Sequence, residues 1–255
     1  MAHLAGTKTP LVIAHRGASS KAPENTFAAY DLAWKLNSDA IEIDIRKTRD
    51  SFFVCSHDNN LNRVSSCKKS LSSMSLSELA DVDIGSWKSL KYKNERMPLF
   101  SKVLSKIPDG KKVFIEIKGA LEEIDELIDI VKKSRLKTRN CHFLSYIPAN
   151  IKKIKTDFPS FKATLNTIPA FYNYEINKIN KIIKSSMSDG ISLHIDSSES
   201  IKLVKKLKKE EKFILSWTVN DSSFMKKLIK SQVDGIITDY PQKLNKILDK
   251  KYSII

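Results

Sequence analysis

The sequence predicts a (β/α)8 TIM barrel, and two observations carry this prediction. Short apolar strands alternate with amphipathic helices along most of the chain, a pattern typical of parallel strands joined by crossover helices. Eight such units fit within the 255 residues, which is about the length that this barrel needs. A doubly wound open sheet is the alternative, but the sequence has no Gly-rich phosphate-binding loop to support it.

The first unit begins with the apolar run 11–15, which ends at His15 and is typical of a strand that enters a loop. Apolar residues at helical spacing follow it. We therefore expect a helix at 25–36 that begins at Asn25 or Thr26.

In the strand predicted at 39–47, apolar and charged residues alternate strictly. Its charged residues share one face: Glu42, Asp44 and Arg46. The strand predicted at 112–118 repeats the alternation, with Glu116 and Lys118 on one face. Three carboxylates on two buried strands, with a lysine beside one, indicate a hard divalent cation next to an anionic group. A half-solvated antiparallel sheet with a charged face is the alternative.

The segment between these two strands is less regular. We expect a short strand at 52–57, a Ser-rich loop, a short helix near 77–79 and a helix at 99–106. The rest of the chain is regular. Further strands are expected at 141–145, 161–166, 190–194, 213–219 and 235–238. Helices are expected at 122–134, 149–157, 174–185, 198–209, 222–231 and 242–249.

Composition restricts the partners and the compartment. The formal charge is +15, but Lys dominates and Arg does not cluster with aromatic residues, so we expect no nucleic acid partner. No apolar run reaches the roughly 20 residues that span a bilayer, and we see no secretion signal, so we expect no stable membrane insertion. The chain has three cysteines and no CxxC spacing, so a disulfide framework or a zinc site is not expected. We therefore expect a location in the reducing cytoplasm. The oligomeric state is left open.

In the predicted barrel, the first three barrel strands deliver polar groups to one mouth: His15, Glu42, Asp44, Glu116 and Lys118. An inward-facing carboxylate is costly unless it is paired or bound to a metal. A salt-bridged structural cluster is the alternative to a functional site.

Several motifs occur in one order along the chain. They are His15-Arg16-Gly17, Pro23-Glu24-Asn25-Thr26, Glu42-Ile43-Asp44, His57-Asp58, Met97-Pro98-Leu99, Glu116-Ile117-Lys118, Trp217-Thr218-Val219-Asn220 and Asp234-Gly235-Ile236-Ile237-Thr238-Asp239-Tyr240-Pro241. In this order and spacing the chain resembles the glycerophosphodiester phosphodiesterase family over nearly its whole length. The resemblance implies a TIM barrel that hydrolyses glycerophosphodiesters, such as glycerophosphocholine or glycerophosphoethanolamine, to sn-glycerol 3-phosphate and an alcohol.

The resemblance also implies roles for individual residues. Three carboxylates would hold one divalent cation, Mg²⁺ or Ca²⁺: Glu42, Asp44 and Glu116. His15 and His57 would be the general acid and base, and Arg16 and Lys118 would bind the phosphate. The whole chain, 1–255, would form one domain, and an insertion at about 58–98 would cap the mouth and contact the glycerol.

Three further residues are expected near the site. Trp217 would face inward at the end of its strand and line the substrate channel, or else belong to the core. Glu24 and Asn25 would support the site, or else cap the first helix. His142 and His194 lack supporting partners, and we expect them to be structural.

The chain departs from the family pattern after His57, where Arg63 is followed by a segment without Gly. This departure concerns the capping loop, which would set head-group preference, and leaves the predicted metal site unchanged. The sequence does not choose between water and the substrate 2-hydroxyl as the nucleophile.

Two other functions are considered. A lipid-cleaving relative that acts on lysophospholipids or sphingomyelin would dock through the loop at 168–174. The second alternative is a non-catalytic basic binding protein. Such a protein would not need paired proton-transfer groups, so His15 and His57 argue against it.

Overall fold

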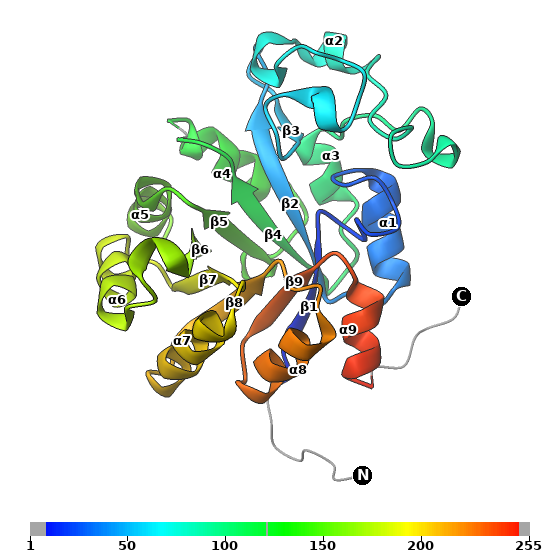
Figure 1. Cartoon of the computed structure of the whole chain (residues 1–255). Helices are drawn as coiled ribbons and strands as arrows, with labels where there is room; N and C mark the ends of the chain where they lie inside the picture. Colours follow the sequence, from blue (N-terminus) through cyan, green and yellow to red (C-terminus); the bar gives the residue numbers. More distant parts are fainter. Residues whose placement is uncertain (1–8, 121, 250–255) are drawn as a thin grey trace.

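The computed structural model describes residues 9–120 and 122–249 (Figure 1). Eight parallel strands form a closed barrel, which confirms the predicted fold class. They are β1 (Leu11–His15), β2 (Ala40–Lys47), β4 (Lys112–Ile117), β5 (Cys141–Ser145), β6 (Lys162–Thr167), β7 (Gly190–His194), β8 (Phe213–Trp217) and β9 (Gly235–Thr238). Their order around the barrel is β1-β9-β8-β7-β6-β5-β4-β2, and pairing of β1 with β2 closes the ring.

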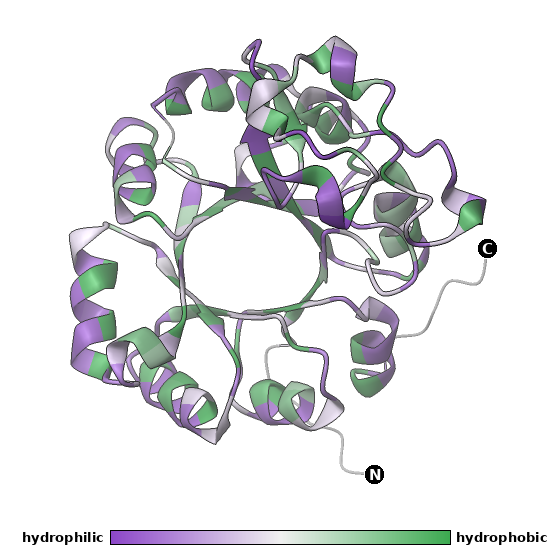
Figure 2. Cartoon of the chain, turned by 45° about the horizontal axis from the view of Figure 1, so that its top comes forward, coloured by the Kyte–Doolittle hydropathy of each residue, from purple (hydrophilic) through white to green (hydrophobic). Residues whose placement is uncertain are grey.

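Helices surround the barrel on its outside (Figure 2). They are α1 (Phe27–Lys35), α3 (Phe100–Ser105), α4 (Ile124–Lys133), α5 (Pro148–Asp157), α6 (Ile176–Ser185), α7 (Ser198–Lys209), α8 (Ser222–Lys230) and α9 (Pro241–Ile247). The main apolar core lies between strands and helices, which is why these helices are amphipathic. None of the helices in the described part of the chain is long and apolar enough to cross a membrane.

A second apolar cluster fills the interior of the barrel: Ile13, Ala40, Phe114, Leu144, Leu215 and Ile237. His142 belongs to this layer, because its ring stacks between Phe114 and Phe213 at centroid distances of 4.9 and 5.4 Å. Burial lowers the pKa of His142 to about 3, so the ring is neutral. His142 is therefore structural, as the sequence predicts.

The loop between β1 and α1 lies at the mouth of the barrel. Its hydrogen bonds show which residue caps the start of α1. The Thr26 hydroxyl accepts a hydrogen bond from the Ala29 backbone N–H at 3.2 Å and donates one to the Pro23 carbonyl at 2.7 Å. Thr26 is therefore the N-cap. Asn25 has a left-handed backbone with φ of +54° and does not cap the helix.

An insertion follows β2. The short strand β3 (Phe53–Cys55) pairs antiparallel with the end of β2, and α2 (Leu76–Leu79) and the 3₁₀ turns η1 (Leu61–Arg63), η2 (Leu71–Ser73) and η3 (Leu90–Tyr92) come next. Eight buried side chains form a core of its own: Val54, Leu61, Val64, Leu71, Met74, Leu79, Ile84 and Met97.

Several hydrogen bonds hold the insertion against the β1–α1 loop, and two of them come from Lys88 and Tyr92. Lys88 Nζ donates to the Ser19 carbonyl at 2.7 Å, and the Tyr92 hydroxyl donates to the Lys21 carbonyl at 2.9 Å. The insertion therefore lies beside the mouth of the barrel, at the top of Figure 1.

Candidate active site

Strand pairing places the predicted site residues side by side at the mouth. His15 is in register with Glu42, and Asp44 is in register with Glu116. Residues in register on neighbouring parallel strands point to the same face, so these side chains share the barrel interior. Lys118 follows directly after β4.

Glu42, Asp44 and Glu116 form a buried cluster, the acidic triad. One carboxylate oxygen of each lies within 4.8 Å of the others, and no member is more than 8% exposed. Burial, together with the charge of Asp44, raises the pKa of Glu42 well above its ordinary value. Burial also acts to raise the pKa of Asp44, but Lys118 and Arg16 outweigh it and hold this pKa below its ordinary value.

Two cations contact the acidic triad. Lys118 Nζ lies 2.9 Å from Asp44 Oδ1 and also pairs with Glu116 Oε1. Arg16 Nε lies 3.1 Å from Asp44 Oδ2, and the Arg16 backbone N–H donates to Glu42 Oε2 at 3.1 Å. Glu42 Oε1 is buried and accepts no hydrogen bond from the described residues. Three carboxylates that converge on one point, one of them with an unpaired buried oxygen, are the oxygen ligands that a hard divalent cation prefers, so the donor set fits such an ion.

Each of the two predicted catalytic histidines pairs with a carboxylate through Nδ1. His15 Nδ1 lies 2.7 Å from Asp239 Oδ1, and His57 Nδ1 lies 2.6 Å from Asp58 Oδ1. A carboxylate in this position favours the tautomer that carries its proton on Nδ1 and leaves Nε2 for other partners. Burial lowers the pKa of His57.

Asp239 is itself held firmly. Asn220 Nδ2 donates to Asp239 Oδ2 at 2.6 Å, and the Ser19 hydroxyl donates to Asp239 Oδ1 at 2.9 Å. Burial acts to raise the pKa of Asp239, but its bonds with His15, Asn220 and Ser19 outweigh burial and bring this pKa to about 2. Asp239 is therefore ionised at neutral pH.

Glu24 and Asn25 contact site residues and leave the N-cap of α1 to Thr26. Arg16 Nη1 donates to Glu24 Oε1 at 2.8 Å. Asn25 Nδ2 donates to Asp44 Oδ2 at 2.8 Å. Both contacts join these two residues to predicted site residues, and neither residue caps α1.

Trp217 ends β8 and lies at the mouth, where its indole N–H donates to the Ser192 carbonyl at 3.0 Å. Its ring contacts Tyr146 edge-on at 5.6 Å and His194 at 4.8 Å between centroids. His194 thus lies beside a predicted site residue, although the sequence suggests only a structural role for it.

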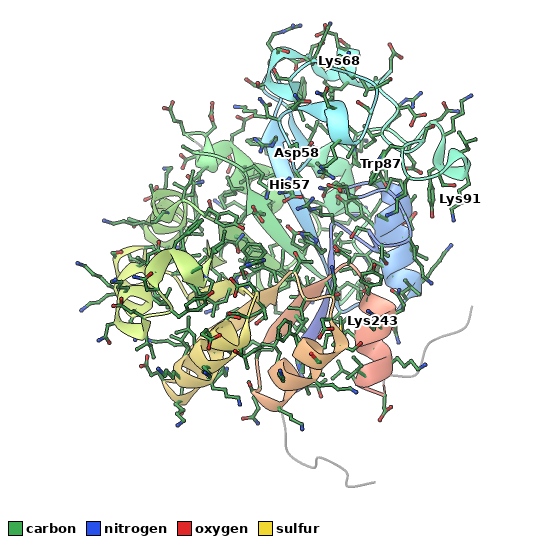
Figure 3. The ribbon with its side chains drawn as sticks, in the orientation of Figure 1. His57, Asp58, Lys68, Trp87, Lys91 and Lys243 are labelled. Carbon is green, nitrogen blue, oxygen red and sulfur yellow. The ribbon has the colours of Figure 1, made fainter. Side chains whose placement is uncertain are left out.

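Three cavities of the described residues adjoin the site. One lies at the insertion and is lined by Glu24, Asn25, His57, Asp58 and Arg63, among others. The other two lie at the mouth of the barrel. The deeper one is lined by His15, Glu42, Glu116, Asn166 and Trp217, together with Leu144 and Ile237. The wider one, of about 280 Å³, lies between the β1–α1 loop and the insertion and includes Trp87, Lys88, Asp239 and Tyr240 in its wall. His57 and Trp87 both lie on the mouth side of the barrel (Figure 3).

Sequence reasoning did not assign a role to Asp58, Asp239 or Asn166. Asp58 and Asp239 lie within the motifs His57-Asp58 and Thr238-Asp239, so the motifs themselves could have identified them. Asn166 is 5% exposed and its Oδ1 has no hydrogen-bond partner among the described residues, although it lines the deeper cavity. No sequence pattern indicates it.

The chain matches the glycerophosphoryl diester phosphodiesterase family over residues 15–243. The chain belongs to this family. A glycerophosphodiester phosphodiesterase of Caldanaerobacter subterraneus is 32% identical over 246 residues, which cover 94% of this chain and 98% of that protein. The Bacillus subtilis protein YhdW is also 32% identical, over 90% of this chain and 94% of its own length. Members of this family are phosphodiesterases, and the chain is an enzyme of this class.

Solved structures agree with this result. An Oleispira antarctica phosphodiesterase, determined in complex with the product sn-glycerol-3-phosphate, superposes with a TM-score of 0.82 at 26% identity. The match covers 94% of this chain and 97% of that one. A glycerophosphodiester phosphodiesterase from Agrobacterium tumefaciens has the same fold, with a TM-score of 0.77 at 22% identity over 94% of this chain and 100% of its own.

Proposed function

We propose that the chain is a metal-dependent phosphodiesterase that converts glycerophosphodiesters, such as glycerophosphocholine or glycerophosphoethanolamine, to sn-glycerol 3-phosphate and an alcohol. The observation that carries the proposal is the acidic triad beside two histidines, each paired with a carboxylate at Nδ1. The Oleispira antarctica relative holds sn-glycerol-3-phosphate as its product, and we extend this product to the present chain.

Glu42, Asp44 and Glu116 would hold one divalent cation, Mg²⁺ or Ca²⁺, because carboxylate oxygens suit both ions. When bound, the ion supplies Lewis-acid neutralisation of the nonbridging phosphate oxygens. Arg16 and Lys118 lie against the same carboxylates and would bind the phosphate. The arginine offers two parallel N–H donors and the lysine a point charge.

His15 and His57 would exchange protons with the substrate. One imidazole accepts the proton of the nucleophile as the new P–O bond forms, and the other donates a proton to the leaving oxygen as the old P–O bond breaks. Pairing of Nδ1 with Asp239 or Asp58 leaves this proton transfer to Nε2 in both rings. Water and the substrate 2-hydroxyl are both compatible with the site as nucleophile.

The remaining roles concern the walls of the site. Trp217 would line the substrate channel, since it borders the deeper cavity. Glu24 and Asn25 would support the site through Arg16 and Asp44. The insertion at 58–98 would cap the mouth as part of a single domain, 1–255.

We also propose a cytoplasmic location for this enzyme. The three cysteines are free thiols, and Cys55 and Cys141 are buried. Free, buried thiols suit a reducing compartment.

The loop at 168–174 does not favour action on lipids. Phe171 is exposed, but Tyr172 packs against the main core, and the Tyr174 hydroxyl bonds to Asp196 at 3.2 Å. One exposed aromatic residue is ordinary for a protein surface. We therefore retain a water-soluble glycerophosphodiester as the substrate.

The proposal is tested by incubating the protein with glycerophosphocholine and either Mg²⁺ or Ca²⁺, and coupling released glycerol 3-phosphate to its dehydrogenase. We expect product with at least one ion, loss of activity in EDTA, and a fall in kcat of about 10²–10⁴-fold in His57→Ala. Thermal unfolding of the variant is the control for folding. Full activity in EDTA, or wild-type turnover from His57→Ala, would contradict the proposal.

A further inference from the structure

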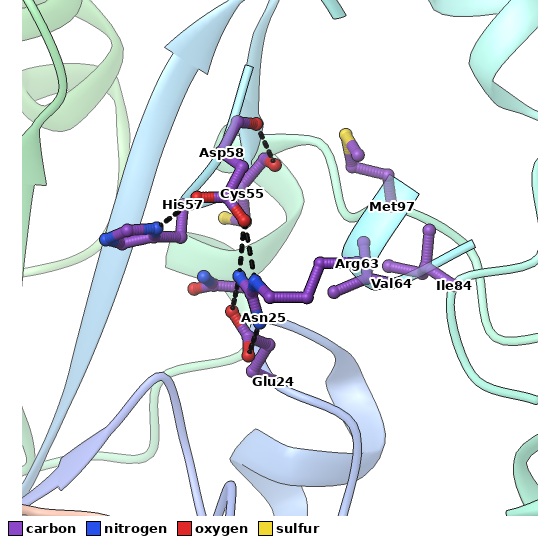
Figure 4. A pocket seen from close by; sticks show the side chains of 10 residues that line it. Glu24, Asn25, Cys55, His57, Asp58, Arg63, Val64, Ile84 and Met97 are labelled. Carbon is purple, nitrogen blue, oxygen red and sulfur yellow. Dashed lines mark hydrogen bonds and ion pairs between the residues drawn. The ribbon is translucent and has the colours of Figure 1, made fainter. Parts of the chain in front are cut away.

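Arg63 reaches from the insertion to two carboxylates beside the site. It ends η1 (Leu61–Arg63) and lies between the buried residues Leu61 and Val64, which belong to the core of the insertion. Its guanidinium therefore starts from a well-packed segment. Figure 4 shows this side chain extended toward Glu24 and Asp58.

The guanidinium engages both carboxylates at once. Arg63 Nε donates to Asp58 Oδ2 at 2.7 Å. On the other side, Nη1 donates to Glu24 Oε2 at 2.5 Å and Nη2 donates to Glu24 Oε1 at 2.8 Å. A planar fork with five N–H donors can serve two carboxylates in this way, whereas an ammonium group is a single point of charge.

Each of these carboxylates also holds a residue of the proposed site. The second oxygen of Asp58 pairs with His57 Nδ1 at 2.6 Å, and Glu24 Oε1 accepts from Arg16 Nη1 at 2.8 Å. An unbroken chain of contacts therefore runs from His57 through Asp58, Arg63 and Glu24 to Arg16. Two carboxylates and two guanidiniums alternate along it, so that their formal charges cancel.

We propose that Arg63 is a positioning residue for the phosphodiesterase reaction, which fixes the His57 ring through Asp58 and the Arg16 guanidinium through Glu24. The inference rests on the proposed roles of His57 and Arg16. It gives the insertion a second role besides capping the mouth, because the insertion then supplies the residue that joins the proton-transfer group to the phosphate-binding group.

The charge of Arg63 also acts on His57 through Asp58. Charged groups from several elements surround the His57 ring: Arg16, Asp44, Asp58 and Lys118. Arg46 Nε donates to the His57 backbone carbonyl at 2.8 Å. Without Arg63, the Asp58 carboxylate would be uncompensated and would stabilise the imidazolium more strongly, so the pKa of His57 would rise.

The test compares Arg63→Gln and Arg63→Lys with a matched control, Arg49→Gln. Arg49 is also an ion-paired arginine, 2.9 Å from Glu78 and 2.7 Å from the Ser73 carbonyl, and it contacts no residue of the proposed site. We expect Arg63→Gln to lower kcat about 10²-fold, the cost of a misplaced catalytic group. The kcat of Arg63→Lys should lie between the values of Arg63→Gln and wild type, and the kcat of Arg49→Gln should equal the wild-type value.

A titration of the His57 imidazole by NMR separates positioning from folding and needs no turnover. We expect the midpoint to rise in Arg63→Gln and to stay at the wild-type value in Arg49→Gln. A wild-type protein that hydrolyses no glycerophosphodiester would refute the proposed function, while the titration would still test the link from Arg63 to His57. A wild-type kcat in Arg63→Gln would overturn the inference. So would a loss of activity that only matches the fraction of unfolded Arg63→Gln protein, if the midpoint of the His57 titration is unchanged.

Discussion

Asp239 shows how single side chains join distant parts of the chain at the site. It lies 2.7 Å from His15, although the two residues are 224 positions apart in sequence. The pairing exists because β9 lies beside β1 in the closed barrel, with Ala14 in register with Thr238. A partly buried carboxylate that is paired and hydrogen-bonded in this way stabilises the fold as well as the ring.

The pH dependence of stability tests Asp239. Its pKa falls from 3.8 to about 2 in the folded protein, so its contribution is fully present above pH 4 and is lost as the pH falls toward 2. The shift corresponds to about 2 kcal/mol. We expect the free energy of unfolding in urea to differ between wild type and Asp239→Asn by about this amount at pH 7, and by clearly less at pH 3. A difference that is the same at both pH values would contradict this assignment.

The sequence indicates which residues are candidates for the site, but it does not indicate which of their side chains contact one another. Alternation along the strands predicts that Glu42, Asp44 and Glu116 face one side, and the structure brings them together. Asn166 has no such pattern, because its place in the deeper cavity depends on barrel closure. The sequence marks Arg63 only as the start of an unusual loop, since its two partners lie on separate segments.

At the level of elements, the β1–α1 loop is a tightly constrained connection of the site. Gly17 has φ of +83°, and a Cβ at this position would lie 2.6 Å from the Ala29 backbone carbonyl carbon. The loop therefore needs glycine for its backbone conformation and for its close approach to α1. Its neighbour Arg16 is left-handed too, with φ of +55°.

Two glycine variants separate these requirements. Gly110 has a similar φ of +79°, but a Cβ added there would meet no atom within 4 Å, so Gly110→Ala measures the backbone cost alone, about 1–2 kcal/mol. We expect Gly17→Ala to lower the free energy of unfolding by about 1–3 kcal/mol more, because overpacking adds to the backbone cost. Equal losses in the two variants would show that the close approach to α1 is unimportant.

Element boundaries follow closely from the sequence where one periodicity dominates. The strands at 11–15, 141–145, 190–194 and 235–238 and the helix at 198–209 agree with the structure residue for residue. The helix expected at 174–185 begins later, at Ile176, because Asn173 and Tyr174 have positive φ and turn the chain first. The insertion is less predictable, since its 3₁₀ turns are defined by packing within its own core.

At the scale of the whole molecule, barrel closure is what makes the site. Pairing of β1 with both β2 and β9 brings residues from the two ends of the chain to one mouth, and the insertion adds groups from the middle. The fold class was predictable because strand–helix alternation and length leave few architectures. The positions of the cavities were not, since they depend on side chains from many elements at once.

We propose that the acidic triad holds a divalent cation. Isothermal titration of the metal-free protein with Mg²⁺ and with Ca²⁺ tests it most directly, with Asp44→Asn as the variant and Asp50→Asn, in the turn between β2 and β3, as the control. We predict one site per chain for at least one ion, weakened at least tenfold in Asp44→Asn and unchanged in Asp50→Asn. Absence of binding by both ions, or equal binding in Asp44→Asn, would contradict the account.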